Sequence, residues 1–309
     1  MVETHLLRRY EGNPILTAAD FPRPVNSVFN AAVTTYRGQT ILLNRVEDLT
    51  GSSSLWLARS DDGIHFTPEP EPALLPSAEE PYHMVEHFSL EDPRITQIDD
   101  YYYITYAGFS QYDCATVLAR TTDFKEFERV AIITVPDNKN VVLFPEMFNG
   151  RYARLERPMT RTSQQGNIWV SFSPDLVYWG DPHFLMGPQP RKWDEFKIGP
   201  GAPPIRTQEG WLEIYHGVRR TASGALYRLG AVLLDLDEPW RIIGRAPVAI
   251  LSPVKGEDYM GNVANVVFSC GALLHGDDVK VYYGAADHVM CLATAPVDDI
   301  ITLCLQSNS

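Results

Sequence analysis

The 309-residue sequence lacks any long hydrophobic run, and no apolar stretch approaches the roughly 18 residues that suggest a membrane-spanning helix. The amino-terminal stretch MVETHLLRRYEGNPIL also lacks the apolar segment of about 7 to 15 residues that follows the basic start of a signal peptide. We therefore expect a cytoplasmic protein that has no membrane partner.

Cysteine is scarce: the four residues are Cys114, Cys270, Cys291 and Cys304. None forms a C-x-x-C pair of the kind that zinc or redox sites use, and the eight histidines show no H-E-x-x-H spacing. A G-x-S-x-G nucleophile motif is absent as well. We expect buried free thiols, no metal site and no resident cofactor.

Basic residues are outnumbered, with 26 Lys and Arg against 39 Asp and Glu, and the formal net charge is −13. A protein of this charge repels polyanions, so the composition disfavours a nucleic-acid partner or an anionic membrane surface. A local basic pocket remains compatible with this overall charge.

The sequence also has little helical periodicity. No amphipathic stretch with a 3.6-residue period exceeds about ten residues, and 21 Gly and 23 Pro interrupt potential helices. Apolar and aromatic runs of strand length recur instead, at 40–48, 101–109, 151–158, 211–218 and 279–286. This pattern predicts an all-β protein.

A weak repeat indicates how the strands are organised. Each copy has an apolar strand-like run, then turn residues that include an Asp, then a second hydrophobic segment, as in an antiparallel hairpin. Five copies centre on Asp62, Asp123, Asp175, Asp237 and Asp298, at spacings of 61, 52, 62 and 61 residues.

Five units of about sixty residues, each able to supply four short strands, favour a five-bladed β-propeller over a sandwich. We expect residues 1–309 to form this single domain, with the start and the end of the chain completing one blade together. The alternative is that Asp turns, which are common in β-proteins, recur here by chance.

Polar residues at the inner ends of propeller blades converge on an axial pocket. Asn30 in SVFNAAVTTY and Arg45 in ILLNRVED are candidates on the first unit. In the second unit, LEDPRIT sets Asp92 before Pro93, which fixes the backbone and predicts a sharp turn at the start of a strand. Asp92 is then either a catalytic group or a turn residue that accepts backbone hydrogen bonds.

Cations cluster in an otherwise acidic chain. A subset of them could form an anion pocket, because ammonium and guanidinium groups suit phosphate oxygens, while the others point to solvent. Within residues 136–161 these candidates, with one amide, are Lys139, Asn140, Arg151, Arg154, Arg157 and Arg161. Lys197 precedes a Gly/Pro loop in FKIGPGAPPIRT, which could equally be a plain connector.

Aromatic and polar residues at further strand ends suit sugar faces and hydroxyl groups, although a Tyr at a strand end also serves in packing. The candidates for sugar contacts are Tyr215 and His216 in IYHGV, Tyr227 in YRLGAV, and Asp287 in YYGAADH.

Taken together, several stretches resemble glycoside hydrolase family 130, the inverting β-mannoside phosphorylases and related β-mannosidases. The resemblance runs in order from about Asn13 to Ala295 and agrees with a five-bladed propeller. It rests on VFNAAVT, LEDPRIT with YYITY, PDNKNVVLFPE, LERP, SPDLVYWG, KIGPGAPPI, WLEIYHGV, GAVLLDLDEPWRIIGRAP and VYYGAADHVMCLATA.

The resemblance implies that Asp92 is the proton donor and that Asn30, Arg45 and Asp287 hold the sugar whose glycosidic bond is cleaved. It also implies that inorganic phosphate binds at Lys139, Asn140, Arg157, Lys197 and Tyr227. Two positions depart from the family pattern. Lys139 stands where an Arg is expected and lacks the two-pronged grip, and Glu156 stands where a His is expected, which predicts a negative charge beside the anion site.

Inverting cleavage needs an acid for the leaving oxygen and a nucleophile on the opposite face of the sugar. Phosphate arrives already anionic and needs only cations, so we expect phosphorolysis of β-mannosides: β-1,2-mannobiose, mannooligosaccharides or β-1,4-mannosides. The products would be α-D-mannose 1-phosphate and a shortened acceptor. The partners are then a mannoside and inorganic phosphate, and the sequence leaves a homo-oligomer open.

Two alternatives remain at this stage. Water as nucleophile would need a second carboxylate as base, for which Glu213, Glu257 or Asp258 are available. A carbohydrate-binding propeller without catalysis is the other. In either enzyme Asp92 has to be protonated, so we expect burial and Glu91 to raise its pKa against the opposing effect of Arg94.

Overall fold

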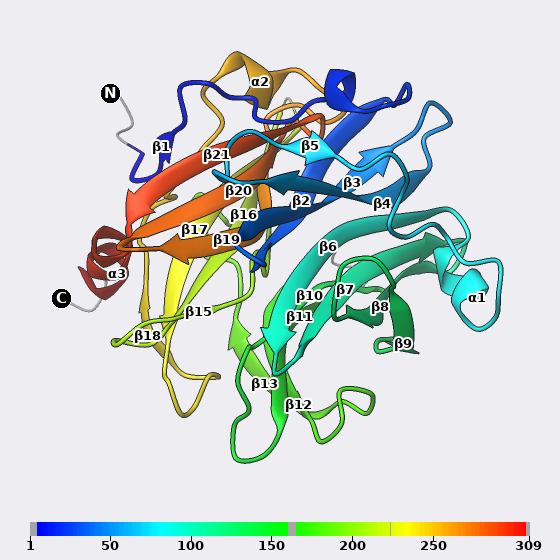
Figure 1. Ribbon diagram of the computed structural model, residues 1–309. Helices are drawn as coiled ribbons and strands as arrows, with labels where there is room; N and C mark the ends of the chain where they lie inside the picture. Colours follow the sequence, from blue (N-terminus) through cyan, green and yellow to red (C-terminus); the bar gives the residue numbers. More distant parts are fainter. Residues whose placement is uncertain (1–4, 160–164, 223, 307–309) are drawn as a thin grey trace.

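The computed structural model describes residues 5–159, 165–222 and 224–306. Over these residues five antiparallel sheets surround a common axis, so the chain forms a five-bladed β-propeller (Figure 1). The sequence prediction of an all-β fold with five blades is confirmed.

Blades 1 and 2 are four-stranded and follow one another along the chain. Blade 1 contains β2 (Ser27–Tyr36), β3 (Gln39–Glu47), β4 (Ser53–Ser60) and β5 (Thr67–Pro68). Blade 2 contains β6 (Ser89–Ile98), β7 (Tyr101–Ser110), β8 (Asp113–Thr121) and β9 (Glu128–Ile132). Between them in the chain lies α1 (Tyr82–Glu86), which packs on β7 and β8.

Blade 3 is also four-stranded, and blade 4 has five strands. Blade 3 contains β10 (Asn138–Leu143), β11 (Tyr152–Pro158), β12 (Ile168–Ser173) and β13 (Gly180–Met186). Blade 4 contains β14 (Lys197–Gly199), β15 (Ile205–Arg206), β16 (Trp211–Thr221), β17 (Gly224–Leu234) and β18 (Ile242–Arg245), with β14 and β15 pairing to the same edge of β16.

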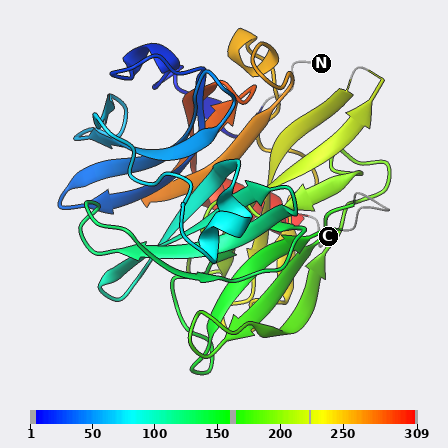
Figure 2. The same ribbon diagram turned by 90° about the vertical axis from the view of Figure 1, so that its right-hand side faces the viewer.

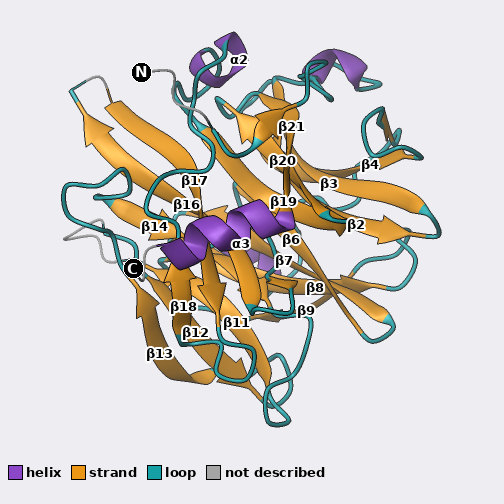
Figure 3. Ribbon diagram, turned by 90° about the vertical axis from the view of Figure 1, so that its left-hand side faces the viewer, coloured by secondary structure: helices purple, strands orange, loops and turns teal. Residues whose placement is uncertain are grey.

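Blade 5 is assembled from both ends of the chain, as the sequence predicted. It contains β19 (Val267–His275), β20 (Asp278–Ala285), β21 (Val289–Pro296) and, as its outermost strand, β1 (Arg8–Arg9). The short helices η1 (Ala18–Asp20) and α2 (Gly256–Tyr259) lie in connecting segments, while α3 (Val297–Leu305) follows β21 and covers part of β17 and β18 (Figure 3). Pairing of β1 with β21 therefore closes the ring.

Three of the five predicted Asp turns share one geometry. In each, the Asp side chain accepts hydrogen bonds from the backbone N–H groups two and three residues later, as for Asp62, Asp123 and Asp175. In the fourth copy Asp235 makes these bonds, not Asp237. The fifth prediction is wrong: Asp298 lies in the first turn of α3, where a negative charge favours the helix amino terminus.

The inner strands carry irregularities that the sequence did not predict. The pairing register shifts at Phe29/Ala32, Glu91/Arg94 and Lys139/Val142, so β2, β6 and β10 each bulge near their start. The bulges contain Asn30, Asp92 and Asn140, whose φ angles of 49°, 49° and 62° lie in the left-handed region that Asn and Asp tolerate best among non-glycine residues.

The expected sharp turn at the start of a strand is thus corrected, since β6 begins at Ser89 and Asp92 lies inside it. The side chains of the three bulge residues converge on one axial cavity. Later residues of the same strands, such as Thr34 and Gln97, line a separate depression at the opposite end of the axis. The mouth of the site therefore lies on the face where the inner strands begin.

Candidate active site

The axial cavity encloses about 140 Å³ and brings together ten of the eleven predicted site residues. They come from all five blades and are Asn30, Arg45, Asp92, Lys139, Asn140, Arg157, Lys197, His216, Tyr227 and Asp287. Val263, Val266 and Phe268 complete the wall and were missed by sequence reasoning. The signal for Phe268 was its position near the start of the fifth inner strand, β19.

The carboxylate side of the cavity is built around Asp92. Its Oδ1 accepts hydrogen bonds from Asn30 Nδ2 at 2.9 Å and from Arg45 Nη1 at 3.2 Å. Arg45 Nη2 lies 3.0 Å from Glu91 Oε1, so one guanidinium group bridges two neighbouring acids. Gly284 makes room for Asn30, because a Cβ at residue 284 would collide with Asn30 Oδ1. These contacts fix the orientation of the Asp92 carboxylate.

The charges around Asp92 correct one expectation. Burial would raise the pKa of Asp92, but Arg45, Lys139 and Arg94 together outweigh burial and lower it. Asp287 lines the same cavity, and burial together with the charge of Asp92 raises its pKa to about 7. The surrounding charges therefore make Asp92 the stronger acid of the two.

Arg94, which lies outside the cavity wall, holds the backbone at Asp92 in place. Its guanidinium donates to the backbone oxygens of Asp92 at 2.7 Å, Gly201 at 3.0 Å and Pro200 at 3.3 Å. Arg94 thereby ties the bulge of β6 to the Gly/Pro loop that follows Lys197. Glu213 accepts the Gly201 N–H at 2.9 Å, and burial raises the pKa of Glu213 to about 8.

The opposite side of the cavity concentrates positive charge. Lys139, Arg157 and Lys197 line it together, and Nε and Nη2 of Arg157 have no hydrogen-bond partner among the residues that the structure describes. Burial, followed by the charges of Arg157 and Lys139, lowers the pKa of Lys197 to about 7. Arg157 thus has two donors without a partner among the described residues, and a bound anion would accept hydrogen bonds from them.

His216 organises this cationic side. Burial and the neighbouring cations lower its pKa well below the ordinary value, so the imidazole is neutral. Its Nε2 lies 3.2 Å from Arg157 Nη1 and 3.4 Å from Asn140 Nδ2, both of which are donors, so Nε2 accepts and the proton resides on Nδ1. The ring packs 4.5 Å from that of Phe268. His216 therefore aligns two of the predicted phosphate contacts.

Tyr215 is the predicted residue that does not line the cavity. Successive residues of a strand point to opposite faces, so Tyr215 lies on the other face of β16 from His216. Its hydroxyl donates to Asp194 Oδ2 at 3.1 Å and accepts from Arg245 Nε at 3.0 Å. The predicted sugar contact of Tyr215 is corrected to a structural role in blade 4.

Glu156 is likewise turned away from the cavity. Its carboxylate accepts hydrogen bonds from Arg154 and Asn138, at 2.8 and 2.7 Å, and from Ser171 at 2.7 Å. The expected negative charge beside the anion site is therefore absent from the cavity wall. Arg151, another candidate cation, pairs with the exposed Asp181, and Arg161 lies outside the described residues.

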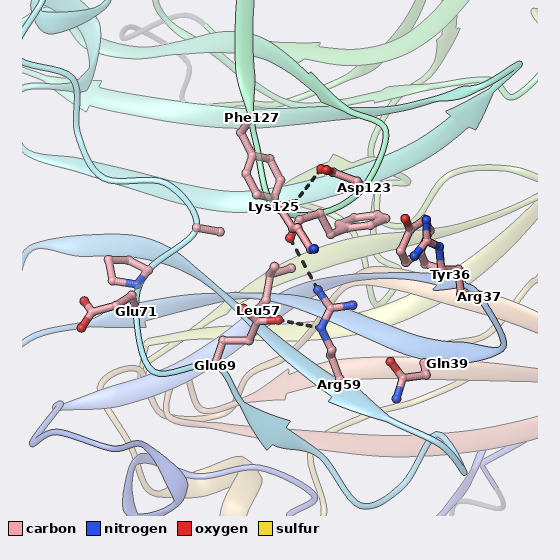
Figure 4. Close-up of a pocket in the computed structure, with 13 residues that line it drawn as sticks. Tyr36, Arg37, Gln39, Leu57, Arg59, Glu69, Glu71, Asp123, Lys125 and Phe127 are labelled. Carbon is pink, nitrogen blue, oxygen red and sulfur yellow. Dashed lines mark hydrogen bonds and ion pairs between the residues drawn. The ribbon is translucent and has the colours of Figure 1, made fainter.

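A larger cavity of about 640 Å³ lies at the junction of blades 1 and 2 (Figure 4), but it contains none of the predicted site residues. Arg59 lies between Glu69 Oε1 at 2.5 Å and the backbone oxygen of Phe124 at 3.5 Å, so its charge is already compensated. Tyr36, at the end of β2, places this cavity away from the mouth of the axial site.

No group of three or more His, Cys, Asp or Glu side chains in the described part of the chain is arranged to hold a metal ion. None of its helices has the length and apolar character needed to cross a bilayer.

A propeller whose axial cavity sets a buried carboxylate against a cluster of cations defines a carbohydrate-active enzyme. The chain belongs to glycoside hydrolase family 130: the family model described as β-1,4-mannooligosaccharide phosphorylase matches residues 4–306. The family predicted from the sequence is confirmed.

Two relatives show how similar the chain is to characterised members. It is 37% identical over 300 residues to a β-1,4-mannooligosaccharide phosphorylase of Ruminococcus albus, covering 95% of this chain and 89% of the relative. It is also 37% identical over 309 residues to a 1,2-β-oligomannan phosphorylase of a Thermoanaerobacter species, covering 95% and 98%. The two relatives act on different linkages according to their names.

The fold agrees with that of a solved family member. The β-1,2-mannobiose phosphorylase of Listeria innocua, in complex with β-1,2-mannobiose, superposes with a TM-score of 0.89 at 32% identity. The comparison covers 96% of this chain and 99% of that one. The similarity therefore extends over the whole propeller.

Proposed function

We propose that this protein catalyses inverting phosphorolysis of β-mannosides. The observation that carries the proposal is the cationic cluster of Lys139, Arg157 and Lys197, which shares one small cavity with Asp92 and includes two unpaired donors of Arg157. A phosphate ion matches this cluster in charge and in hydrogen-bonding capacity. The names of the relatives, all phosphorylases of β-mannosides, support the same reaction.

Each side of the cavity has one role in the reaction. A phosphate oxygen held by Lys139, Arg157 and Lys197 attacks the anomeric carbon of the terminal mannosyl unit. The bond to the leaving oxygen breaks, and that oxygen takes the proton of Asp92. Attack from the opposite face inverts the β-linkage, so the products are α-D-mannose 1-phosphate and an acceptor shortened by one unit.

Phosphate binding also shifts the protonation state of Asp92. Arg45 and Lys139 both help to lower the pKa of Asp92. A bound phosphate places negative charge beside that ammonium group, which offsets its effect and favours the protonated carboxyl. The neighbouring Asp287, with its pKa raised to about 7, supplies a proton within the same cavity. Both effects favour the protonated form of Asp92 when phosphate is bound.

Hydrolysis is the less favoured function. The carboxylates that line the cavity, among the described residues, are Asp92 and Asp287. Of the alternative bases, Glu213 bonds to the Gly201 backbone and Asp258 to Arg9 at 2.7 Å, and Glu257 also lies outside the cavity wall. A water molecule would therefore have Asp287 as its base, and Asp287 holds its own proton up to about pH 7, which disfavours this role.

The linkage of the substrate is left to experiment, because the two relatives at 37% identity are named for β-1,4 and β-1,2 linkages. The purified protein should be incubated with β-1,2-mannobiose and with β-1,4-mannobiose, each with and without inorganic phosphate. We expect α-D-mannose 1-phosphate and mannose from one of them, only with phosphate. Release of free mannose at equal rates with and without phosphate would contradict phosphorolysis.

A further inference from the structure

Exposed aromatic side chains lie on the mouth-side end of blade 2. Phe88 follows α1 and is 45% exposed, and Phe109, near the end of β7, is 38% exposed. Figure 2 shows α1 on the face turned to the viewer, and Figure 3 shows α3 on the opposite face. We refer to His87, Phe88 and Phe109 as the aromatic platform.

The rings of the platform form a continuous row. The ring centroids of His87 and Phe88 are 5.0 Å apart, and those of Phe88 and Phe109 are 6.0 Å apart. All three residues are exposed, so the row presents apolar ring surface to solvent beside polar groups. A contiguous apolar surface of this kind, rimmed by polar groups, is typical of a binding surface.

The strand register connects the platform to the catalytic acid. Ser89 pairs with Phe109 and Glu91 pairs with Ala107, and directly paired residues share one face of a sheet. Phe109 therefore lies about 7 Å along β7 from Ala107 and outward of Glu91. Glu91 contacts Arg45, which contacts Asp92.

Polar side chains lie near Asp92 and the aromatic platform. Ser89 Oγ donates to Glu91 Oε1 at 3.1 Å, and Arg45 Nε donates to Ser53 Oγ at 3.1 Å. Both serines are buried, so a ligand that extends from Asp92 toward solvent along blade 2 would pass the partly exposed Glu91 carboxylate first and aromatic rings next. Sugars bind to surfaces with this combination of polar and apolar groups.

Buried contacts of α1 fix the position of the aromatic platform. Glu86, fully buried at the end of α1, accepts hydrogen bonds from the Tyr106 hydroxyl at 2.7 Å and from Arg129 at 2.9 and 2.8 Å. The helix lies directly on β7 at Gly108, where a Cβ would come within 2.7 Å of the Val85 carbonyl oxygen. A rigid surface loses little entropy when a ligand binds.

We propose that the aromatic platform binds mannosyl units on the acceptor side of the substrate, beyond the unit joined to the scissile bond. This inference rests on the proposed function. A β-mannopyranose carries the axial hydrogens of C1, C3 and C5 on one face, and this apolar face stacks on Phe88 and Phe109. The protein then favours mannooligosaccharides of three or more units over mannobiose.

The test compares chain lengths in Phe88→Ala and Phe109→Ala. For mannotetraose of the linkage that the protein accepts, we expect kcat/KM to fall about tenfold, while the value for mannobiose changes less than about twofold. Phe88→Trp should retain the preference because it keeps an aromatic ring. The matched control is Tyr178→Ala, which removes a 75% exposed aromatic from the turn after β12, and it should leave both values unchanged.

Other outcomes would overturn the platform proposal. Equal losses on mannobiose and mannotetraose, or no loss on either, contradict a role restricted to longer substrates. A lower oligomeric state of Phe109→Ala, measured by light scattering, would assign the surface to contact between copies of the chain. Calorimetric binding of mannotetraose to Asp92→Asn, with and without Phe109→Ala, needs no turnover, so the platform can be judged even if the protein proves to be a hydrolase.

Discussion

Glu156 and Arg157 are neighbours in β11, yet their side chains lie on opposite faces of blade 3. Arg157 lines the axial cavity, whereas Glu156 contacts Arg154 and Asn138 in the interior of the blade. Asn138 is followed by Lys139, which lines the cavity from the adjacent strand. Glu156 therefore anchors the start of β10 through its hydrogen bond with Asn138. Its negative charge lies on the face of the blade that is turned away from the anion site.

Removing this acid should destabilise the protein strongly. Glu156→Ala leaves the Arg154 guanidinium buried without its carboxylate, which we expect to lower the free energy of unfolding by about 3 to 5 kcal/mol. Ser171→Ala is the matched control, because it removes one hydrogen bond of Glu156 and one of Arg154 but no charge, and it should cost about 2 kcal/mol. Urea unfolding measures both, and equal losses for the two variants would disprove the charge argument.

Asp92→Asn should separate an enzyme from a carbohydrate-binding propeller. The amide preserves the shape of the side chain but cannot protonate the leaving oxygen, so we expect kcat to fall about a thousandfold. Binding of mannobiose, measured by calorimetry, should persist. The control is Asp100→Asn, an exposed acid in the turn after β6, which should leave kcat unchanged. A fully active Asp92→Asn would remove Asp92 from the role of proton donor.

The pH dependence of phosphate binding should depend on Lys197. Because its pKa is lowered to about 7, its amine loses the charge as pH rises above that value, and KM for phosphate should increase between about pH 7 and 9. Lys197→Arg stays charged throughout, so its KM should increase less. The ionisation of phosphate affects both proteins equally and cancels in their ratio. A ratio that stays constant over this pH range would contradict titration of Lys197.

Gly199 should be required for alignment of the phosphate contacts. A Cβ at this position would lie 2.5 Å from His216 Cε1 and 2.9 Å from Asn140 Nδ2. We expect Gly199→Ala to displace both groups and to raise KM for phosphate by about ten- to a hundredfold. Gly180→Ala places its Cβ in open space and serves as the control. If the two variants have the same KM, the close approach at Gly199 has no functional importance.

The sequence predicted the architecture well because each blade repeats the same local chemistry. The Asp turns at Asp62, Asp123 and Asp175 are set by hydrogen bonds within a few residues, which sequence spacing can report. Asp298 matched the spacing but not the structure, since Pro296 ends β21 and two acids then favour a helix. Local composition could not distinguish these two outcomes.

The site was predictable in its membership but not in its geometry. Ten candidate residues converge because all five blades meet at the axis on the face where the inner strands begin, which follows from the fold. The exclusion of Tyr215 depends on the face that His216 occupies, and hence on strand register. The left-handed conformation of Asp92 depends on a bulge that involves a second strand. The lowered pKa of Asp92 requires the positions of cations from other blades, which a linear sequence does not contain.

The pairing of β1 with β21 has a consequence for biosynthesis. Arg8 emerges from the ribosome long before Thr294, its partner in blade 5. Blades 1 to 4 can form while translation continues, but the nascent chain has to keep its first strand unpaired until the last one arrives. Because blade 5 also contributes Phe268 to the cavity, the cavity wall is complete only once blade 5 has been synthesised. Assembly of the axial cavity is thus coupled to closure of the ring by β1 and β21.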